Sequence, residues 1–122
     1  MISREHRFHG YNSLRQTYRT GKTVRSPLFS VKTVLNEKRQ TYRVAVVVSR
    51  KVNKSAVARN RLRRRIYEAV GNIENNIARP HDIVITVFHD SMLDESLVAL
   101  SKQIKKLFSQ AGIIDKSSPS QG

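Results

Sequence analysis

The sequence predicts a single α+β domain in which helices pack on one mixed central sheet, in the order α-β-β-α-β-α. Three stretches repeat apolar residues at helical spacing, and three short stretches are rich in Val and Ile without that period. The 122 residues contain neither an internal repeat nor a linker, so the chain has room for one core. We assign the domain to residues 1–114 and expect residues 115–122, which are polar and contain Pro and Gly, to be a disordered tail.

The first element that the pattern predicts is a short amphipathic helix before Gly21. Leu14 and Tyr18 lie one turn apart on its apolar face, and Gly21 suits the position that follows a helix. Residues 22–27 should then form a loop, because the residue before a proline is pushed out of the α region.

Two strands follow, at residues 28–35 and 41–49, and a polar hairpin turn at 36–40 should join them. The second strand contains the unbroken run VAVVV at 44–48. Such a run lacks polar alternation, which favours a central strand covered on both faces.

A long helix is expected after Lys54, and a third strand at 82–88 separates it from a last helix. The apolar stripe of the long helix consists of Ala58, Leu62, Ile66, Ala69 and Ile73, with Val70 and Ile77 beside it. The stripe of the last helix consists of Leu97, Leu100, Ile104, Leu107 and Phe108. Ser91 or Asp94 should cap this last helix, and Gly112 should end it.

Positive charge is the strongest functional signal in the sequence. Lys and Arg total 23 against 9 acidic residues, which gives a net charge of +14. Between residues 50 and 65 the chain has no acid and eight basic residues, namely Arg50, Lys51, Lys54, Arg59, Arg61, Arg63, Arg64 and Arg65. Such a segment repels itself and favours a polyanionic partner, either a nucleic acid or an anionic membrane surface. Docking of the apolar stripe on the sheet should present these arginines outward as a ridge.

Several classes of function are disfavoured by what the sequence lacks. It has no Cys, so disulfides, thiolate zinc sites and thiol chemistry are excluded. Its start has no apolar signal region and its longest apolar run is 44–48, so we expect a soluble, cytoplasmic protein. The four His residues lack carboxylates at ligand spacing, and no nucleophile–base pair is apparent. We therefore predict no metal site and no catalytic residue in the protein itself.

The segment at residues 43–68, RVAVVVSRKVNKSAVARNRLRRRIYE, resembles the signature of the bacterial ribonuclease P protein component. In that family a strand R-V-x-x-x-V-S-K-K leads through a short turn into A-V-x-R-N-R-x-K-R. The strand exit at 49–51, the triplet at 59–61 and the pair Arg63-Arg64 occur here in the same order. The resemblance extends along most of the chain.

The resemblance implies an α/β sandwich with a rare left-handed parallel β-α-β crossover. It also implies the non-catalytic protein subunit of ribonuclease P, which removes the 5′ leader from precursor tRNA with a catalytic RNA. The Mg²⁺ ions would be held mainly by that RNA. The protein, monomeric when free, would grip the RNA with its arginine-rich helix and guide the leader through a cleft between the first helix and the sheet.

Carried over to this chain, the resemblance assigns two sets of residues. The RNA-binding set comprises Arg50, Lys51, Lys54, Arg59, Asn60, Arg61, Arg63, Arg64 and Arg65. The leader-cleft set comprises Phe8, Leu14, Tyr18 and Lys32. The chain departs from the family at Leu14, where an aromatic residue is usual, and at Tyr67, where a basic residue is common. It also reads Val87-Phe88-His89 where the family commonly has A-R-P.

Several of these residues also have an interpretation without a specific binding role. The arginine run could be a solvated helix face, Tyr18 could simply pack in the core, and Lys32, Arg50 and Lys51 could be charges that protect a sheet edge. Two other functions share the charge pattern, namely an RNA-scaffolding protein such as a ribosomal protein and a DNA-binding regulator. The regulator is disfavoured, because a face of almost only Arg lacks the mixed polar set that reads bases.

Overall fold

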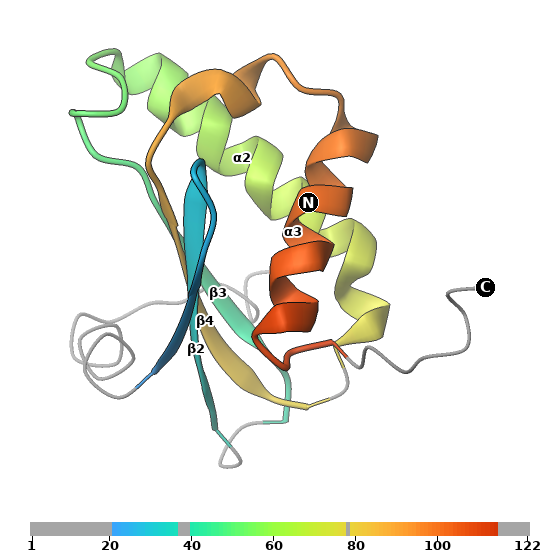
Figure 1. The fold of residues 1–122 in the computed structure, drawn as a ribbon. Helices are drawn as coiled ribbons and strands as arrows, with labels where there is room; N and C mark the ends of the chain where they lie inside the picture. Colours follow the sequence, from blue (N-terminus) through green and yellow to red (C-terminus); the bar gives the residue numbers. More distant parts are fainter. Residues whose placement is uncertain (1–20, 37–39, 78, 115–122) are drawn as a thin grey trace.

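The computed structural model describes residues 21–36, 40–77 and 79–114. They form a four-stranded sheet with two α-helices on one of its faces (Figure 1). The strands are β1 (Lys22–Arg25), β2 (Phe29–Leu35), β3 (Arg43–Val47) and β4 (His81–Val87). The helices are α2 (Ala56–Ile73) and α3 (Leu97–Gln110), and short 3-10 turns occur at Glu74–Asn76 and Asp90–Leu93.

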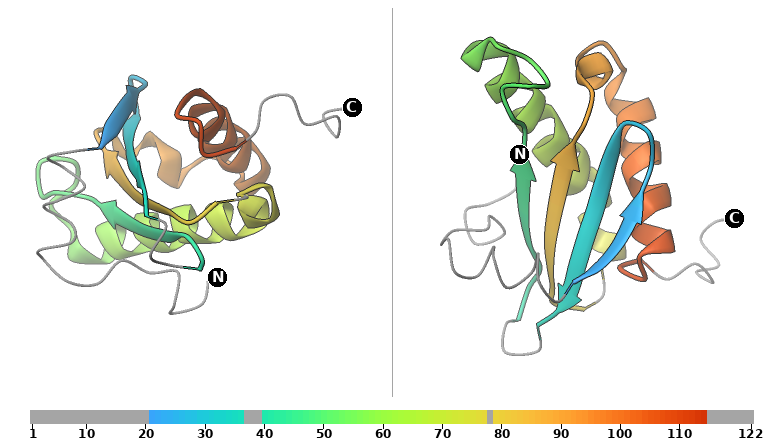
Figure 2. Two further views of the ribbon diagram at one scale, coloured as in Figure 1. Left: turned by 90° about the horizontal axis from the view of Figure 1, so that it is seen from below. Right: turned by 60° about the vertical axis from the view of Figure 1, so that its left-hand side comes forward.

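The sheet is mixed and has the strand order β1-β2-β4-β3. β2 pairs antiparallel with both β1 and β4, whereas β3 pairs with β4 in parallel. The parallel pair is joined through α2. In the right-hand view of Figure 2, β3 and β4 both run upward, α2 returns behind them, and β4 lies to the right of β3. This connection is left-handed, so the predicted fold class is confirmed with its unusual crossover.

Three local predictions about the strands are wrong. Residues 22–25 form β1 rather than a loop, and they pair with residues 30–33 of β2. Residues 36–40 do not form a hairpin turn, because β2 pairs with β4 and not with β3. β3 lies at an edge of the sheet rather than at its centre. Four residues of its apolar run, Val44, Ala45, Val46 and Val48, are nevertheless buried.

The predicted stripe of α2 is confirmed, since Leu62, Ile66, Ala69, Val70 and Ile73 are all buried. They pack in one core with the helix-facing residues of the sheet, among them Val31, Val44, Val46, Ile83 and Ile85. Burial of each larger aliphatic side chain stabilises the fold by about 1.5–3 kcal/mol. The stripe therefore holds α2 in one orientation despite the charge repulsion along its outer side.

The last helix also follows its predicted stripe, with Leu100, Ile104, Leu107 and Phe108 buried. Its N-cap is Ser96, whose side chain accepts a hydrogen bond from the Ala99 amide at 3.1 Å. Of the two predicted caps, Ser91 lies within the 3-10 turn that precedes α3, and Asp94 is the C-cap of that turn. Gly112 ends the helix as predicted, with a φ of +81° that favours glycine.

The first predicted helix and the predicted tail at 115–122 lie outside the described residues. Near the end of the described chain, Ile114 forms an isolated antiparallel bridge with Ile77 and is buried. Within the described ranges, neither α-helix has the length and apolar content that a bilayer span requires.

Candidate nucleic-acid interface

The turn between β3 and α2 is fixed by side-chain hydrogen bonds to the backbone. The side-chain oxygen of Asn53 accepts a hydrogen bond from the Ser55 amide at 2.9 Å, and the Asn53 Nδ2 donates one to the Asp90 carboxylate at 3.0 Å. Ser55 caps α2, because its hydroxyl accepts a hydrogen bond from the Ala58 amide at 3.2 Å. The start of the basic helix is therefore anchored both to its own turn and to the segment after β4.

Arg59 belongs to this anchor. Its Nη1 donates to the backbone carbonyls of Asn53 at 2.9 Å and of Lys54 at 3.0 Å. Arg50, Lys51 and Lys54 lie on the same turn with exposed side chains. Arg59 thus stiffens a turn that carries three exposed cations, in addition to the RNA contact that the sequence assigns to it.

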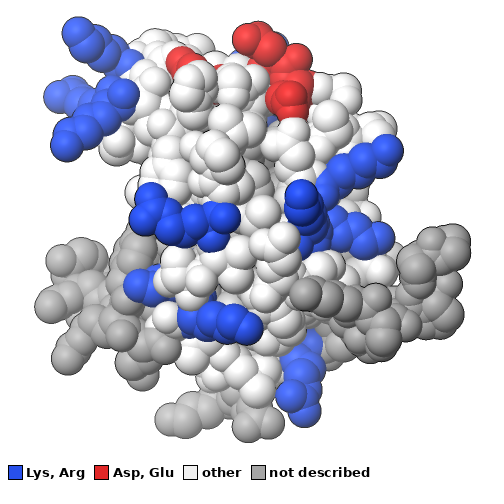
Figure 3. All heavy atoms as spheres, in the orientation of Figure 1, with Lys and Arg blue, Asp and Glu red and all other residues white. Residues whose placement is uncertain are grey.

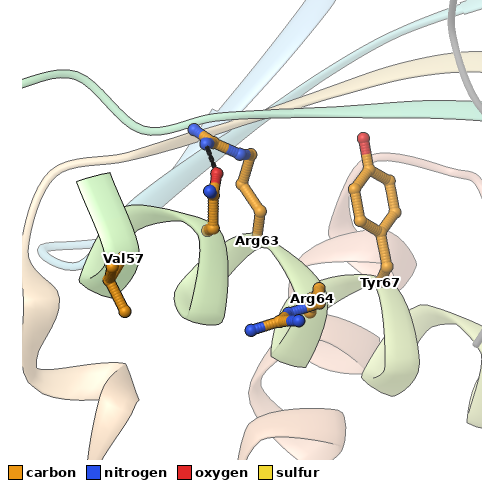
Figure 4. Close-up of a pocket in the computed structure, with 5 residues that line it drawn as sticks. Val57, Arg63, Arg64 and Tyr67 are labelled. Carbon is orange, nitrogen blue, oxygen red and sulfur yellow. Dashed lines mark hydrogen bonds between the residues drawn. The ribbon is translucent and has the colours of Figure 1, made fainter.

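Beyond this turn, α2 directs a polar and basic side outward. Asn60, Arg61 and Arg64 are exposed, and Arg63 is half-buried. The Arg63 guanidinium donates to the Asn60 side-chain oxygen, as the dashed line in Figure 4 shows. In the part of the chain that the structure describes, no α2 arginine forms an ion pair with a carboxylate. The charges of the exposed Arg61 and Arg64 therefore remain available to an anionic partner.

A pocket of about 540 Å³ opens on this side of α2, and we call it the α2 pocket. Its lining residues are Val57, Asn60, Arg63, Arg64 and Tyr67 (Figure 4). Val57 is 75% exposed, which is unusual for so apolar a side chain. The Tyr67 hydroxyl accepts a hydrogen bond from the Val46 amide of β3 at 3.4 Å, so this ring closes the side of the pocket nearest the sheet edge.

Sequence reasoning missed Val57 and Tyr67 as members of this site. Val57 is in neither the predicted apolar stripe nor the RNA-binding set, and Tyr67 is named as a departure from the family and not as a site residue. The signal that could have found them is helical spacing, since Val57, Asn60, Arg64 and Tyr67 are separated by three or four residues and so share one side of α2.

Arg65 lies apart from the other arginines of α2. Its guanidinium donates to the backbone carbonyl of Glu95, in the segment that leads into α3. Its Nε is buried without a hydrogen-bond partner. Of the nine basic and polar residues assigned to RNA binding, Arg59 and Arg65 therefore bind the protein's own backbone, and Arg65 is the one that contacts the segment before α3.

Of the four leader-cleft residues, the structure describes Lys32; Phe8, Leu14 and Tyr18 lie outside the described residues. Lys32 is half-buried on β2, where Val31 and Thr33 point toward the helices and Lys32 points to the opposite face of the sheet. Its cross-strand neighbours there are Thr23 and Val84.

Charge is distributed unevenly over the described surface. Figure 3 shows Lys and Arg side chains over much of one face, while acidic side chains gather at its upper end, over the segment that leads into α3. Among residues 21–36, 40–77 and 79–114, no group of three His, Asp or Glu side chains could hold a metal ion. The chemistry that the α2 side can support is the binding of phosphates by guanidinium groups, with apolar and aromatic contact beside them.

Comparison with known proteins identifies the family of the chain. A sequence profile described as Ribonuclease P matches residues 2–112. The ribonuclease P protein component of Chloroflexus aurantiacus is 33% identical over 113 residues, covering 93% of this chain and 82% of the relative. That of Synechocystis sp. is 30% identical over 105 residues, covering 86% and 84%.

Solved structures share the fold. The RNase P protein of Staphylococcus aureus superposes with a TM-score of 0.78 at 22% identity, covering 90% of this chain and 98% of that one. The RNase P protein of Thermotoga maritima gives a TM-score of 0.71 at 21% identity, covering 80% and 89%. The chain therefore belongs to the ribonuclease P protein component family, an RNA-binding component of a tRNA-processing ribonucleoprotein.

Proposed function

We propose that this chain is the protein subunit of bacterial ribonuclease P and that α2 binds the catalytic RNA. The observation that carries the proposal is the outward side of α2, where Asn60, Arg61, Arg63 and Arg64 project without a carboxylate partner among the described residues. An arginine fork can bind a phosphate through two parallel hydrogen bonds. A helix that presents several such forks suits the phosphate backbone of a folded RNA.

Rigidity supports the same proposal. The buried stripe of α2, its Ser55 cap and the Arg59 contacts to the preceding turn hold the basic side in one position before the RNA arrives. A side chain or helix that is already positioned loses less conformational entropy on binding. The entropy cost of ordering the protein therefore offsets little of its electrostatic attraction to the RNA.

The α2 pocket adds an apolar element to this basic side. Val57 and Tyr67 lie beside Arg63 and Arg64. An unpaired base or a ribose can contact either Val57 or Tyr67 while its phosphate binds an arginine. The α2 side would then bind a nucleotide of irregular RNA better than the regular backbone of a duplex.

We further propose that the protein contacts the 5′ leader of precursor tRNA through Phe8, Leu14, Tyr18 and Lys32. Lys32 supports this part, because it lies on the face of the sheet opposite α2 and α3. In this proposal the RNA subunit carries the chemistry and holds the Mg²⁺ ions, and the free protein is a monomer. The cleaved bond is the one that joins the leader to the mature tRNA 5′ end.

The proposal is tested by adding the purified protein to a bacterial ribonuclease P RNA at low magnesium and measuring the cleavage of precursor tRNA. We expect the wild-type protein to raise the cleavage rate and an Arg61→Ala/Arg64→Ala protein to raise it less. Failure of the wild-type protein to raise cleavage would contradict the proposal.

A second measurement distinguishes a protein that contacts the leader of the substrate from one that only scaffolds the RNA. The assembled complex should bind precursor tRNA more tightly than mature tRNA, because only the precursor carries the leader. Equal affinities would favour the scaffold.

A further inference from the structure

A second pocket, of about 430 Å³, lies between the β1–β2 end and α3, and we call it the α3 groove. Its lining residues are Arg25, Ser26, Pro27, Leu28, Phe29, Gln103, Lys106, Leu107 and Gln110. None of them belongs to the α2 pocket. Its volume falls within the range of about 300–1,000 Å³ that is usual for ligand sites.

The α3 groove has an apolar floor and a polar, basic rim. Phe29 and Leu107 are buried beneath it, and Leu28 is half-buried at its side. Lys106 is exposed on the α3 wall, whereas the Arg25 side chain, which follows the core-packed Val24 on β1, points to the face of the sheet away from α3. Figure 3 shows the corresponding pattern, with Lys and Arg side chains over the β1 region and over α3 and uncharged atoms between them.

Arg25 is held on that other face by an aromatic ring. Its guanidinium carbon lies 4.9 Å from the centre of the Phe88 ring, a cation–π contact. Phe88 is 40% exposed and does not line the α3 groove. The contact therefore keeps the Arg25 guanidinium out of the groove and leaves Lys106 as the cation of its α3 wall.

Lys106 lacks a carboxylate partner, because within the described part of the chain it is in no ion pair. Glu95, which does not line the groove, accepts a hydrogen bond from the Gln103 side chain. The Gln103 and Gln110 side chains bring amide groups to the same groove, and glutamine can hydrogen-bond the edge of a base.

We propose that the α3 groove binds an unpaired nucleotide of the ribonuclease P RNA subunit. The base lies against the apolar floor near the two glutamines, and an adjacent phosphate binds Lys106. This combination of an apolar seat, amide groups and a cation matches the chemistry by which proteins hold unpaired RNA bases. The proposal rests on the proposed function, because membership in the family makes an RNA subunit the expected partner.

The test compares two neighbouring lysines of α3. Lys106 lines the groove, whereas Lys105 is equally exposed but does not line it. Lys106→Ala and Lys105→Ala remove the same charge from adjacent positions, so Lys105→Ala is the matched control. A third variant, Gln110→Trp, fills the mouth of the groove from an exposed position at the end of α3 without changing the net charge.

The affinity of each protein for a bacterial ribonuclease P RNA is measured over a series of salt concentrations, after circular dichroism has established an unchanged fold. We expect Lys106→Ala to weaken binding about tenfold more than Lys105→Ala does. Gln110→Trp should also weaken binding about tenfold while keeping the wild-type salt dependence, because it removes the base contact and no phosphate contact.

Two results would overturn the proposal. One is equal affinity of Lys106→Ala and Lys105→Ala together with wild-type affinity of Gln110→Trp. The other is normal affinity of all variants for the RNA subunit with a loss confined to precursor tRNA binding by the assembled complex. Either result can occur while the wild-type protein still raises cleavage, so failure of this inference is distinct from failure of the proposed function.

Discussion

Arg43 and Asp82 form a two-pronged ion pair across the parallel strands β3 and β4. The Nε–Oδ1 distance is 2.9 Å and the Nη2–Oδ2 distance is 2.8 Å, and the two residues are direct partners in the strand register. The Asn36 side chain donates a further hydrogen bond to Asp82 at 2.9 Å. The pair is largely buried, with side-chain exposures of 15% and 7%. It therefore fixes the edge strand that leads into α2.

Removal of this carboxylate should destabilise the protein strongly. Asp82→Ala leaves a largely buried Arg43 guanidinium without its partner, and such a loss typically costs about 3–5 kcal/mol. Urea unfolding of wild type and variant measures the difference. Asp94→Ala is the control, because Asp94 is exposed and its carboxylate is in no ion pair within the described residues. Equal stabilities of the two variants would contradict the role of the pair.

The helix caps allow stability to be separated from RNA binding. Ser55→Ala and Ser96→Ala each remove one cap hydrogen bond, at the start of α2 and of α3 respectively. Each should lower the free energy of unfolding by about 1 kcal/mol. Only Ser55→Ala should also weaken RNA binding, because it loosens the turn that positions the α2 arginines. The melting temperature and the RNA affinity are measured on both proteins, and an equal loss of affinity would argue against a positioned α2.

The stability of the protein should depend on pH through His81. Burial is the main cause that lowers the pKa of His81 below its ordinary value of 6.5. The unfolded chain therefore takes up a proton at this residue before the folded protein does, and stability falls as pH drops below 6.5 toward the lowered folded-state pKa. His81→Gln should reduce this slope. The free energy of unfolding of both proteins is measured at about five pH values from pH 7 downward. An equal loss of stability in the two proteins would refute the assignment to His81.

The helices were predictable because the residues that they bury recur in the sequence at a local, helical period. The stripe from Leu62 to Ile73 repeats every three or four residues, and one face of α2 is buried against the core as that repeat requires. The strands were harder, since pairing depends on residues far apart in the chain. The residues between β2 and β3, at 36–40, do not indicate that β2 pairs with β4 instead of β3. Only the family resemblance supplied the left-handed crossover.

The same contrast holds for the candidate site. The run of arginines indicates an RNA-binding helix by charge alone. Charge does not indicate which guanidinium groups point away from the protein. Arg59 binds the carbonyls of its own turn and Arg65 the carbonyl of Glu95. These contacts arise from the packing of distant segments. Val57 and Tyr67, which line the α2 pocket, likewise carry no charge pattern that a sequence would reveal as a site.

The central claim is that the outward arginines of α2 bind RNA phosphates, and the salt dependence of RNA affinity tests it most directly. Arg61 and Arg79 are both exposed, but Arg61 lies on α2 and Arg79 in the segment before β4. We predict that Arg61→Ala lowers the slope of log affinity against log salt by about one, for one lost phosphate contact, and that Arg79→Ala leaves the slope unchanged. A wild-type slope for Arg61→Ala would contradict the claim.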